Sequence, residues 1–160
     1  MNAEIRNLPP MTVLCAGREG SLSTLPGAFE RLFRYLSGRH VEPGPDLMTI
    51  HNADPVASPF GRLQSEAAVS LGTGHQPDAP GISVKVLPGG TYAVYRHTGP
   101  YSSLMTAWVR FREALGELIA GPQAGPFFEV YVSDPETTPE SDLVTELYCK
   151  VLDDGMPACS

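Results

Sequence analysis

Two short motifs near the carboxyl end of this chain each pair a carboxylate with a tyrosine. Glu129 and Tyr131 lie two residues apart in the run FFEVYV, and Glu146 and Tyr148 have the same spacing in LVTELYCKV. Residues two apart on a strand point to the same face of a sheet. A carboxylate beside a phenol can attract a cation or exchange a proton, and the ring adds a flat apolar surface. We take these two motifs as the candidate site.

Glu129 carries most of the expected chemistry because it interrupts an otherwise apolar strand. A fully buried, unpaired carboxylate would cost much free energy and would tend to protonate. In a partly desolvated, aromatic-lined pocket it could bind a cation or act as a general base. The alternative is an ordinary exposed strand residue.

Other aromatic side chains are candidates for lining the same pocket. Trp108, the only tryptophan, lies on the apolar stripe of a predicted helix, where it belongs to the core or forms a pocket wall. Tyr101 caps the groove or anchors the start of that helix. Tyr148 contacts the ligand or packs across strands. His51 either joins the pocket or is a surface histidine.

The elements that position these residues follow from the apolar pattern. Helical spacing predicts helices over residues 25–38 and 101–120, and the second ends at Gly121-Pro122 because proline cannot continue it. The Gly- and Pro-rich stretch GTGHQPDAPG at 72–81 reads as a linker, and 152–160 as a loose tail. Strands are predicted over 4–8, 12–16, 46–52, 63–71, 82–87, 91–97 and the two runs quoted above.

The second half of the chain repeats the first. Leu8-Pro9 and Thr12 recur 79 positions later as Leu87-Pro88 and Thr91, and the same offset relates Phe29 to Trp108. After one extra residue the offset is 80, which matches Asp54-Pro55 to Asp134-Pro135, Leu63 to Leu143 and Glu66 to Glu146. So many matches in one register predict two ββαββ units, 4–71 and 82–151, in a single domain.

Two such units predict an α+β fold with a meander-like antiparallel sheet, because the connections between strands are short. Two amphipathic helices can cover one face of that sheet and leave the other free. We expect the free face to carry Glu129, Tyr131, Glu146 and Tyr148, with His51 and Glu66 as their first-half counterparts. A pocket between the halves is the expected outcome.

Composition limits the classes of function. The net charge is −7. Binding to phosphate groups needs a basic face, so we expect no direct contact with nucleic acid. No run approaches the roughly 20 apolar residues of a membrane span, and we expect no signal peptide and a cytoplasmic location. The cysteine and histidine spacing predicts no metal site, and no phosphate-loop or dinucleotide motif predicts a cofactor.

The second half resembles a known family. The segments LPGGTYAVYRHTGPY and FFEVYVSDP, separated by the tryptophan-containing helix and followed by TELYCKV, are similar to the GyrI-like family. This is the small-molecule effector-binding domain also found at the C-terminus of some AraC-type and MerR-type regulators. The resemblance is close over 82–151 and lies only in the pattern over 4–71. It implies a GyrI-like or SOUL-like fold of two pseudo-symmetric halves with a ligand groove between them.

The resemblance also implies a function. In drug-responsive members an acidic residue of the groove attracts lipophilic cations between aromatic rings, and Glu129 matches that position. We expect a stand-alone member that senses or sequesters an aromatic or cationic small molecule. One alternative is a hydrolase of cyclopropane-bearing alkylators that uses Glu129 and Tyr131. Another is a protein-interaction module whose partner is a regulator or DNA gyrase. The sequence lacks the helix-turn-helix segment of the regulators.

Overall fold

The computed structural model describes residues 3–17, 25–51, 65–72, 76–118, 123–134 and 136–151. Both predicted helices and all the predicted strands are present. Residues 63–64, the turn at Asp54-Pro55, Gly121-Pro122 and the tail 152–160 lie outside the described residues. The elements are β1 (Ala3–Leu8), β2 (Met11–Gly17), α1 (Leu25–Arg39), β3 (Pro43–His51), β4 (Ser65–Leu71), β5 (Ile82–Leu87), β6 (Gly90–Thr98), α2 (Leu104–Leu118), β7 (Gln123–Tyr131) and β8 (Val144–Val151), with short 3-10 turns at Tyr101–Ser103 and Glu140–Asp142.

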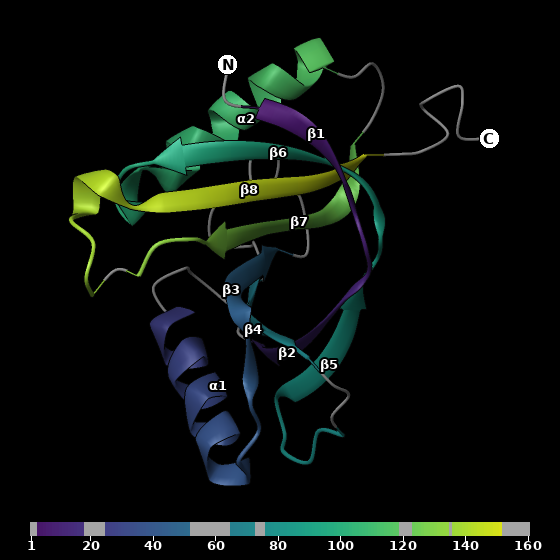
Figure 1. The fold of residues 1–160 in the computed structure, drawn as a ribbon, viewed down its shortest axis with the longest axis vertical. Helices are drawn as coiled ribbons and strands as arrows, with labels where there is room; N and C mark the ends of the chain where they lie inside the picture. Colours follow the sequence, from purple (N-terminus) through teal and green to yellow (C-terminus); the bar gives the residue numbers. More distant parts are fainter. Residues whose placement is uncertain are drawn as a thin grey trace.

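The eight strands form one sheet in the order β1-β6-β8-β7-β3-β4-β2-β5, and every pairing is antiparallel. The α+β fold with an internal repeat is therefore confirmed. The two halves meet where β7 pairs with β3 (Figure 1). Since β7 and β3 are equivalent strands of the two repeats, this seam is the pseudo-twofold centre of the sheet.

The meander prediction is wrong at the first strand of each repeat. β1 pairs with β6 instead of β2, and β5 pairs with β2 instead of β6. Each half of the sheet is thus completed at its outer edge by a strand from the other half. Pro9-Pro10 and Pro88 keep the two connections extended, because a proline supplies no N–H and restricts the residue before it, and the packing of the two connections against each other then selects the crossover over a turn.

The two crossovers touch each other at Gly89. A Cβ atom on Gly89 would lie 2.8 Å from Cδ of Pro10 and 3.0 Å from the carbonyl oxygen of Leu8. Both distances are shorter than an ordinary carbon contact, so only glycine allows this approach. The contact locks the two exchanged strands against one another.

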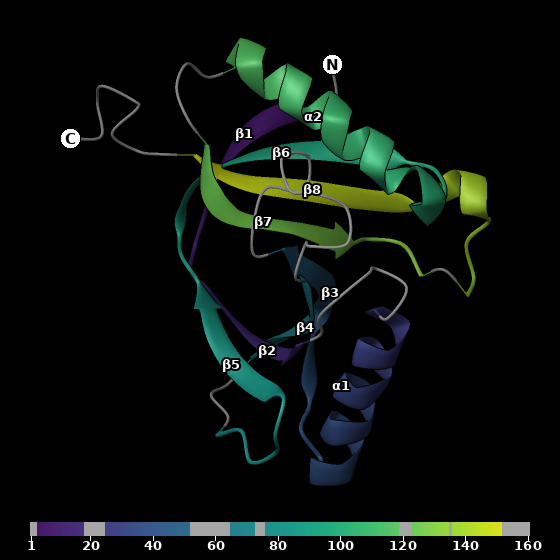
Figure 2. The same cartoon turned by 180° about the vertical axis from the view of Figure 1, so that it is seen from behind.

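Both helices pack on the same face of the sheet, which we call the helix face (Figure 2). Leu32 and Leu36 of α1 contact Leu14 and Val69, while Trp108 of α2 joins a separate cluster. That second cluster also contains Phe111, Leu115, Phe127, Leu147 and Cys149. Phe33 of α1 is 47% exposed and lies outside the cluster that contains Leu32 and Leu36.

The opposite face, which we call the open face, has its own apolar cluster without a covering helix. Tyr92, Phe128 and Tyr148 form its aromatic part, and Met48 and Val130 lie beside them. The prediction that two helices cover one face and leave the other free is confirmed. Alternation along β7 therefore puts Phe128 and Glu129 into different environments.

Gly89→Ala should lower the free energy of unfolding by about 1–3 kcal/mol, because the added methyl group forces the two crossovers apart. The matched control is Gly38→Ala, since nothing lies within 4 Å of a Cβ atom there. The control should be neutral or stabilising, because alanine favours a helix more than glycine does. Urea unfolding measures both variants, and equal destabilisation by the two would contradict the contact.

Candidate functional site

The candidate site lies on the seam between the halves. Thr49 of β3 is directly opposite Glu129 of β7, and the two residues are equivalent positions of the repeat, 80 apart. A residue facing its own counterpart across an antiparallel pair marks the pseudo-twofold axis. The axis therefore passes between a threonine in one half and a carboxylate in the other.

Glu129 is buried, with 7% of its surface exposed, and its carboxylate accepts three hydrogen bonds. Trp108 Nε1 donates to Oε1 over 2.8 Å, and His51 Nε2 lies 3.0 Å from the same oxygen. The Tyr131 hydroxyl donates to Oε2 over 2.9 Å. Three donors from α2, β3 and β7 thus supply the pairing that a buried carboxylate requires.

A second layer orients these donors. The Tyr131 hydroxyl has one proton and gives it to Glu129, so it accepts from Thr49 Oγ1 at 2.6 Å. A carboxylate only accepts, so His51 donates from Nε2, and in its neutral form it accepts at Nδ1 from the Ser65 hydroxyl at 2.8 Å. The pairs His51–Glu129 and Tyr131–Thr49 are equivalent under the repeat, so the site retains its pseudo-symmetry.

This network determines the protonation of the site. Burial acts to raise the pKa of Glu129, but the hydrogen bond and charge of His51 and the hydrogen bonds of Trp108 and Tyr131 outweigh it, so that pKa falls below its ordinary value of 4.5. Burial and the charge of Glu129 raise the pKa of Tyr131 well above 10. The site therefore holds an ionised carboxylate beside a protonated phenol.

A series of aromatic rings continues from Tyr131 to the exposed Tyr101 and Phe33. The Tyr131 ring is 5.2 Å from the Tyr101 ring and 6.2 Å from Phe29, which stacks on Phe33. Tyr101 is 37% exposed. Rings at these positions offer π faces to a cation that approaches Glu129 between the starts of the two helices.

The structure brings together five of the six predicted ligand-binding residues: Glu129, Tyr131, Trp108, Tyr101 and His51. His51 is 4% exposed, so the surface alternative is wrong. The predicted face was also wrong, because Glu129, Tyr131 and His51 lie on the helix face.

Tyr148 does not join them. The register pairs Glu129 with Leu147 and Phe128 with Tyr148, so Tyr148 and Glu146 point to the open face. Glu66 of β4 lies opposite Ile50 of β3 and is on the open face as well. It forms an ion pair with Lys85.

Sequence analysis did not identify Thr49, Ser65 and Phe29 as site residues. The repeat held a usable signal for two of them, because Thr49 is the counterpart of Glu129 and Phe29 is the counterpart of Trp108. Ser65 has no such signal, since only the pairing of β3 with β4 places it opposite His51.

Within the part of the chain that the structure describes, no group of three or more His, Cys, Asp or Glu residues could hold a metal ion. No helix among the described residues is long and apolar enough to cross a membrane. The cytoplasmic location and the lack of direct contact with nucleic acid stay predictions.

An α+β fold of two repeats around one antiparallel sheet, with a buried carboxylate at its seam, defines the class of protein, and comparison of sequences identifies the family. The profile of the GyrI-like small molecule binding domain matches residues 1–152, so the chain belongs to that family. A DNA gyrase inhibitor of Cronobacter sakazakii is 26% identical over 114 residues, which cover 69% of this chain and 72% of that protein.

Solved structures show the same fold. EcmrR in a complex with DNA superimposes with a TM-score of 0.81 at 14% identity, over 93% of this chain and 56% of the EcmrR chain. The C-terminal domain of EcmrR alone gives 0.74 at 16% identity, over 94% and 96% of the two chains. SAV2435 bound to tetraphenylphosphonium gives 0.64 at 16% identity, over 95% and 94%.

Glu129→Gln should lower the free energy of unfolding by about 1–3 kcal/mol at neutral pH, because the amide pairs poorly with three donors. The folded-state pKa of Glu129 is depressed, so its contribution is present above pH 4.5 and lost as the pH falls through the folded pKa. The difference between wild type and variant should therefore shrink between about pH 7 and about pH 3.5.

Urea unfolding at both pH values measures this difference. Exposed Glu42→Gln serves as the charge-matched control and should show little effect at either pH. A Glu129→Gln penalty that stays constant in acid would contradict a lowered pKa.

Proposed function

We propose that the domain binds small aromatic cations at the Glu129 seam and acts as a ligand sensor or a sequestering protein. The observation that carries the proposal is a single carboxylate held ionised in a buried, aromatic-lined position. Charge attraction is stronger in a low-dielectric interior than in water. A cation with aromatic substituents would therefore gain both electrostatic and apolar contact.

The family and its neighbours support this proposal. The GyrI-like domain is a small-molecule binding domain, and SAV2435, which shares its fold, has been solved with tetraphenylphosphonium. That ligand combines one positive charge with four phenyl groups, which are the two features that the seam would recognise. The positive charge of this ligand is surrounded by its own phenyl rings. The carboxylate of Glu129 must therefore attract it across at least one aromatic ring.

Entry of the ligand requires rearrangement of the rings. Glu129 is only 7% exposed. A ligand must therefore either stack on the rings of Tyr101 and Tyr131, or displace these rings to contact the carboxylate directly. Reorientation of side chains subtracts from the gross interaction energy. We expect moderate affinity and broad selectivity, since apolar rings discriminate weakly between ligands of similar shape.

Titration with tetraphenylphosphonium should quench the fluorescence of Trp108, which donates to Glu129. Triphenylphosphine oxide serves as the neutral analogue. Glu129→Gln should weaken binding of the cation about tenfold or more and binding of the neutral analogue much less, because only the cation uses the charge. Glu42→Gln should change neither affinity. Equal losses for cation and neutral analogue would contradict the electrostatic role.

A hydrolase is the second candidate, and one distance favours it. A Glu/Tyr acid–base pair must lie within hydrogen-bond reach, and the Tyr131 hydroxyl is 2.9 Å from Oε2 of Glu129. The lowered pKa of Glu129 argues for binding, because it makes the carboxylate a weak base. Mass spectrometry after long incubation with a cyclopropane-bearing alkylator separates the two. A gain of one water that Glu129→Gln abolishes would establish turnover, and an unchanged compound supports binding alone.

A protein partner is the third role, and an exposed apolar stripe supports it. Tyr101, Met105 and Val109 are all exposed and recur every four residues from the 3-10 turn at Tyr101 into the start of α2. The Cronobacter relative is named as an inhibitor of DNA gyrase. Binding of this chain to gyrase stays a prediction.

A further inference from the structure

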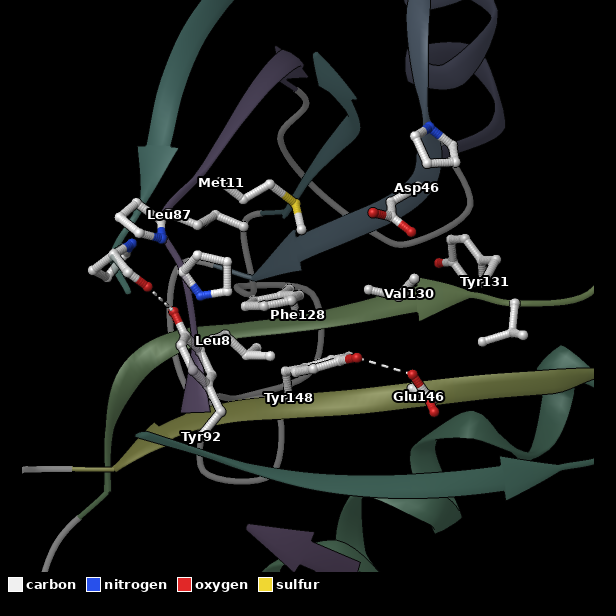
Figure 3. Close-up of a pocket in the computed structure, with 15 residues that line it drawn as sticks. Leu8, Met11, Asp46, Leu87, Tyr92, Phe128, Val130, Tyr131, Glu146 and Tyr148 are labelled. Atoms are coloured by element: carbon white, nitrogen blue, oxygen red, sulfur yellow. Dashed lines mark hydrogen bonds between the residues drawn. The ribbon is translucent and has the colours of Figure 1, made fainter. Parts of the chain in front are cut away.

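The open face of the sheet contains a cavity of about 410 Å³, on the side away from Glu129. It lies between the two crossovers and the strands β7 and β8 (Figure 3). Leu8, Pro9 and Pro10 of one crossover and Leu87 and Pro88 of the other form one wall. The volume is within the range of small-molecule sites.

The opposite wall is flat and aromatic. The rings of Phe128 and Tyr148 stack with 4.8 Å between centroids and 7° between planes. Tyr92 contacts both rings edge-on, and its hydroxyl donates to the carbonyl oxygen of Pro88 over 2.7 Å. That bond ties the aromatic wall to one crossover. Prolines and hydrogen-bonded rings have little freedom to collapse into the space, so the cavity persists.

Two carboxylates face this cavity, and they differ in how they are paired. Glu146 accepts from Tyr148, and it forms ion pairs with Arg6 at 3.3 Å and Arg96 at 3.6 Å. Its charge is therefore balanced by protein groups. Figure 3 shows Asp46 directed toward the cavity from β3, across from Glu146.

Asp46 has no such balance. Its backbone N–H donates to Ser70 Oγ over 3.0 Å, but its carboxylate has no hydrogen bond or ion pair with any other described residue. The side chain is half-buried. After burial and Glu146, the charge of Asp46 contributes to raising the pKa of Tyr148, so its field extends across the cavity. A half-buried carboxylate beside an apolar cavity favours a cationic group.

We propose that this cavity is a second ligand site, which takes a small molecule with a flat aromatic body and a protonated amine. The aromatic body lies against Phe128 and Tyr148, and the ammonium group pairs with Asp46. The Glu129 site and this site use opposite faces of β7, so each can be tested while the other stays intact. Tyr131, at the end of β7, borders this cavity as well, which makes Glu129→Gln a necessary comparison.

Calorimetric titration with naphthylmethylamine and its neutral analogue naphthylmethanol tests the proposal. In Asp46→Asn the amine should bind about tenfold more weakly and the alcohol with unchanged affinity, because only the amine uses the charge. Exposed Glu42→Gln should leave both affinities unchanged. Because the amine is itself an aromatic cation, the comparison is repeated in the Glu129→Gln background, where the tenfold loss caused by Asp46→Asn should persist. A second variant is Val132→Trp, since Val132 lines the cavity and is itself exposed, so a larger side chain there closes the mouth without entering the core. It should abolish binding of both compounds.

Several outcomes would overturn the proposal. The first is that the amine does not bind at millimolar concentration. The second is that Asp46→Asn weakens binding of the amine and of the alcohol equally. The third is that Glu129→Gln abolishes binding of the amine while Asp46→Asn leaves it unchanged. Thermal unfolding verifies that Asp46→Asn is folded. If it is not folded, Val132→Trp decides the question, since unchanged binding in that variant contradicts the cavity as the site.

Discussion

The pairing of one buried carboxylate governs the centre of this protein. An unpaired charge at the position of Glu129 would cost several kcal/mol, so its three donors must all be in place. They come from three elements: His51 from β3, Trp108 from α2 and Tyr131 from its own strand. Because β3 belongs to the first half and α2 and β7 to the second, neither half can satisfy the carboxylate alone. The site exists only where the halves join.

The exchange of the first strands is the architectural counterpart of this dependence. β1 completes the half that contains β6, and β5 completes the half that contains β2. The crossovers that allow the exchange meet at Gly89 and Pro10. The halves are therefore joined at the central seam and again at both outer edges of the sheet. Such interlocking resists the separation that would otherwise expose Glu129.

A strand buried on both faces gives the fold two different environments. On β7 the helix face carries Glu129 with its polar network, and the open face carries Phe128 and Val130 beside a cavity. On the helix face, the rings of Tyr131, Tyr101 and Phe29 lie beside the buried carboxylate of Glu129. The open face is bounded by prolines and stacked rings. Among the described residues, Asp46 is the carboxylate of this cavity that forms no ion pair, whereas Glu146 forms two. Alternation along one strand thus separates two chemistries by the thickness of a sheet.

The sequence by itself determined the elements and the repeat, and it singled out Glu129 as the candidate site, because these depend on local periodicity and on spacing along the chain. The 80-residue offset even relates His51 to Tyr131, and these two residues do meet around Glu129. Their assignment to a face of the sheet failed, because a face is defined only relative to the neighbouring strands.

Tertiary structure decided the rest through pairing between residues distant in the chain. The register of β7 against β8 sets Glu129 beside Leu147 and sends Tyr148 to the opposite face. A shift of one residue in that pairing would have reversed the outcome. The strand exchange is equally invisible in the sequence, since a short connection permits either a hairpin or a crossover. Only the global packing, with Gly89 against Pro10, selects the crossover.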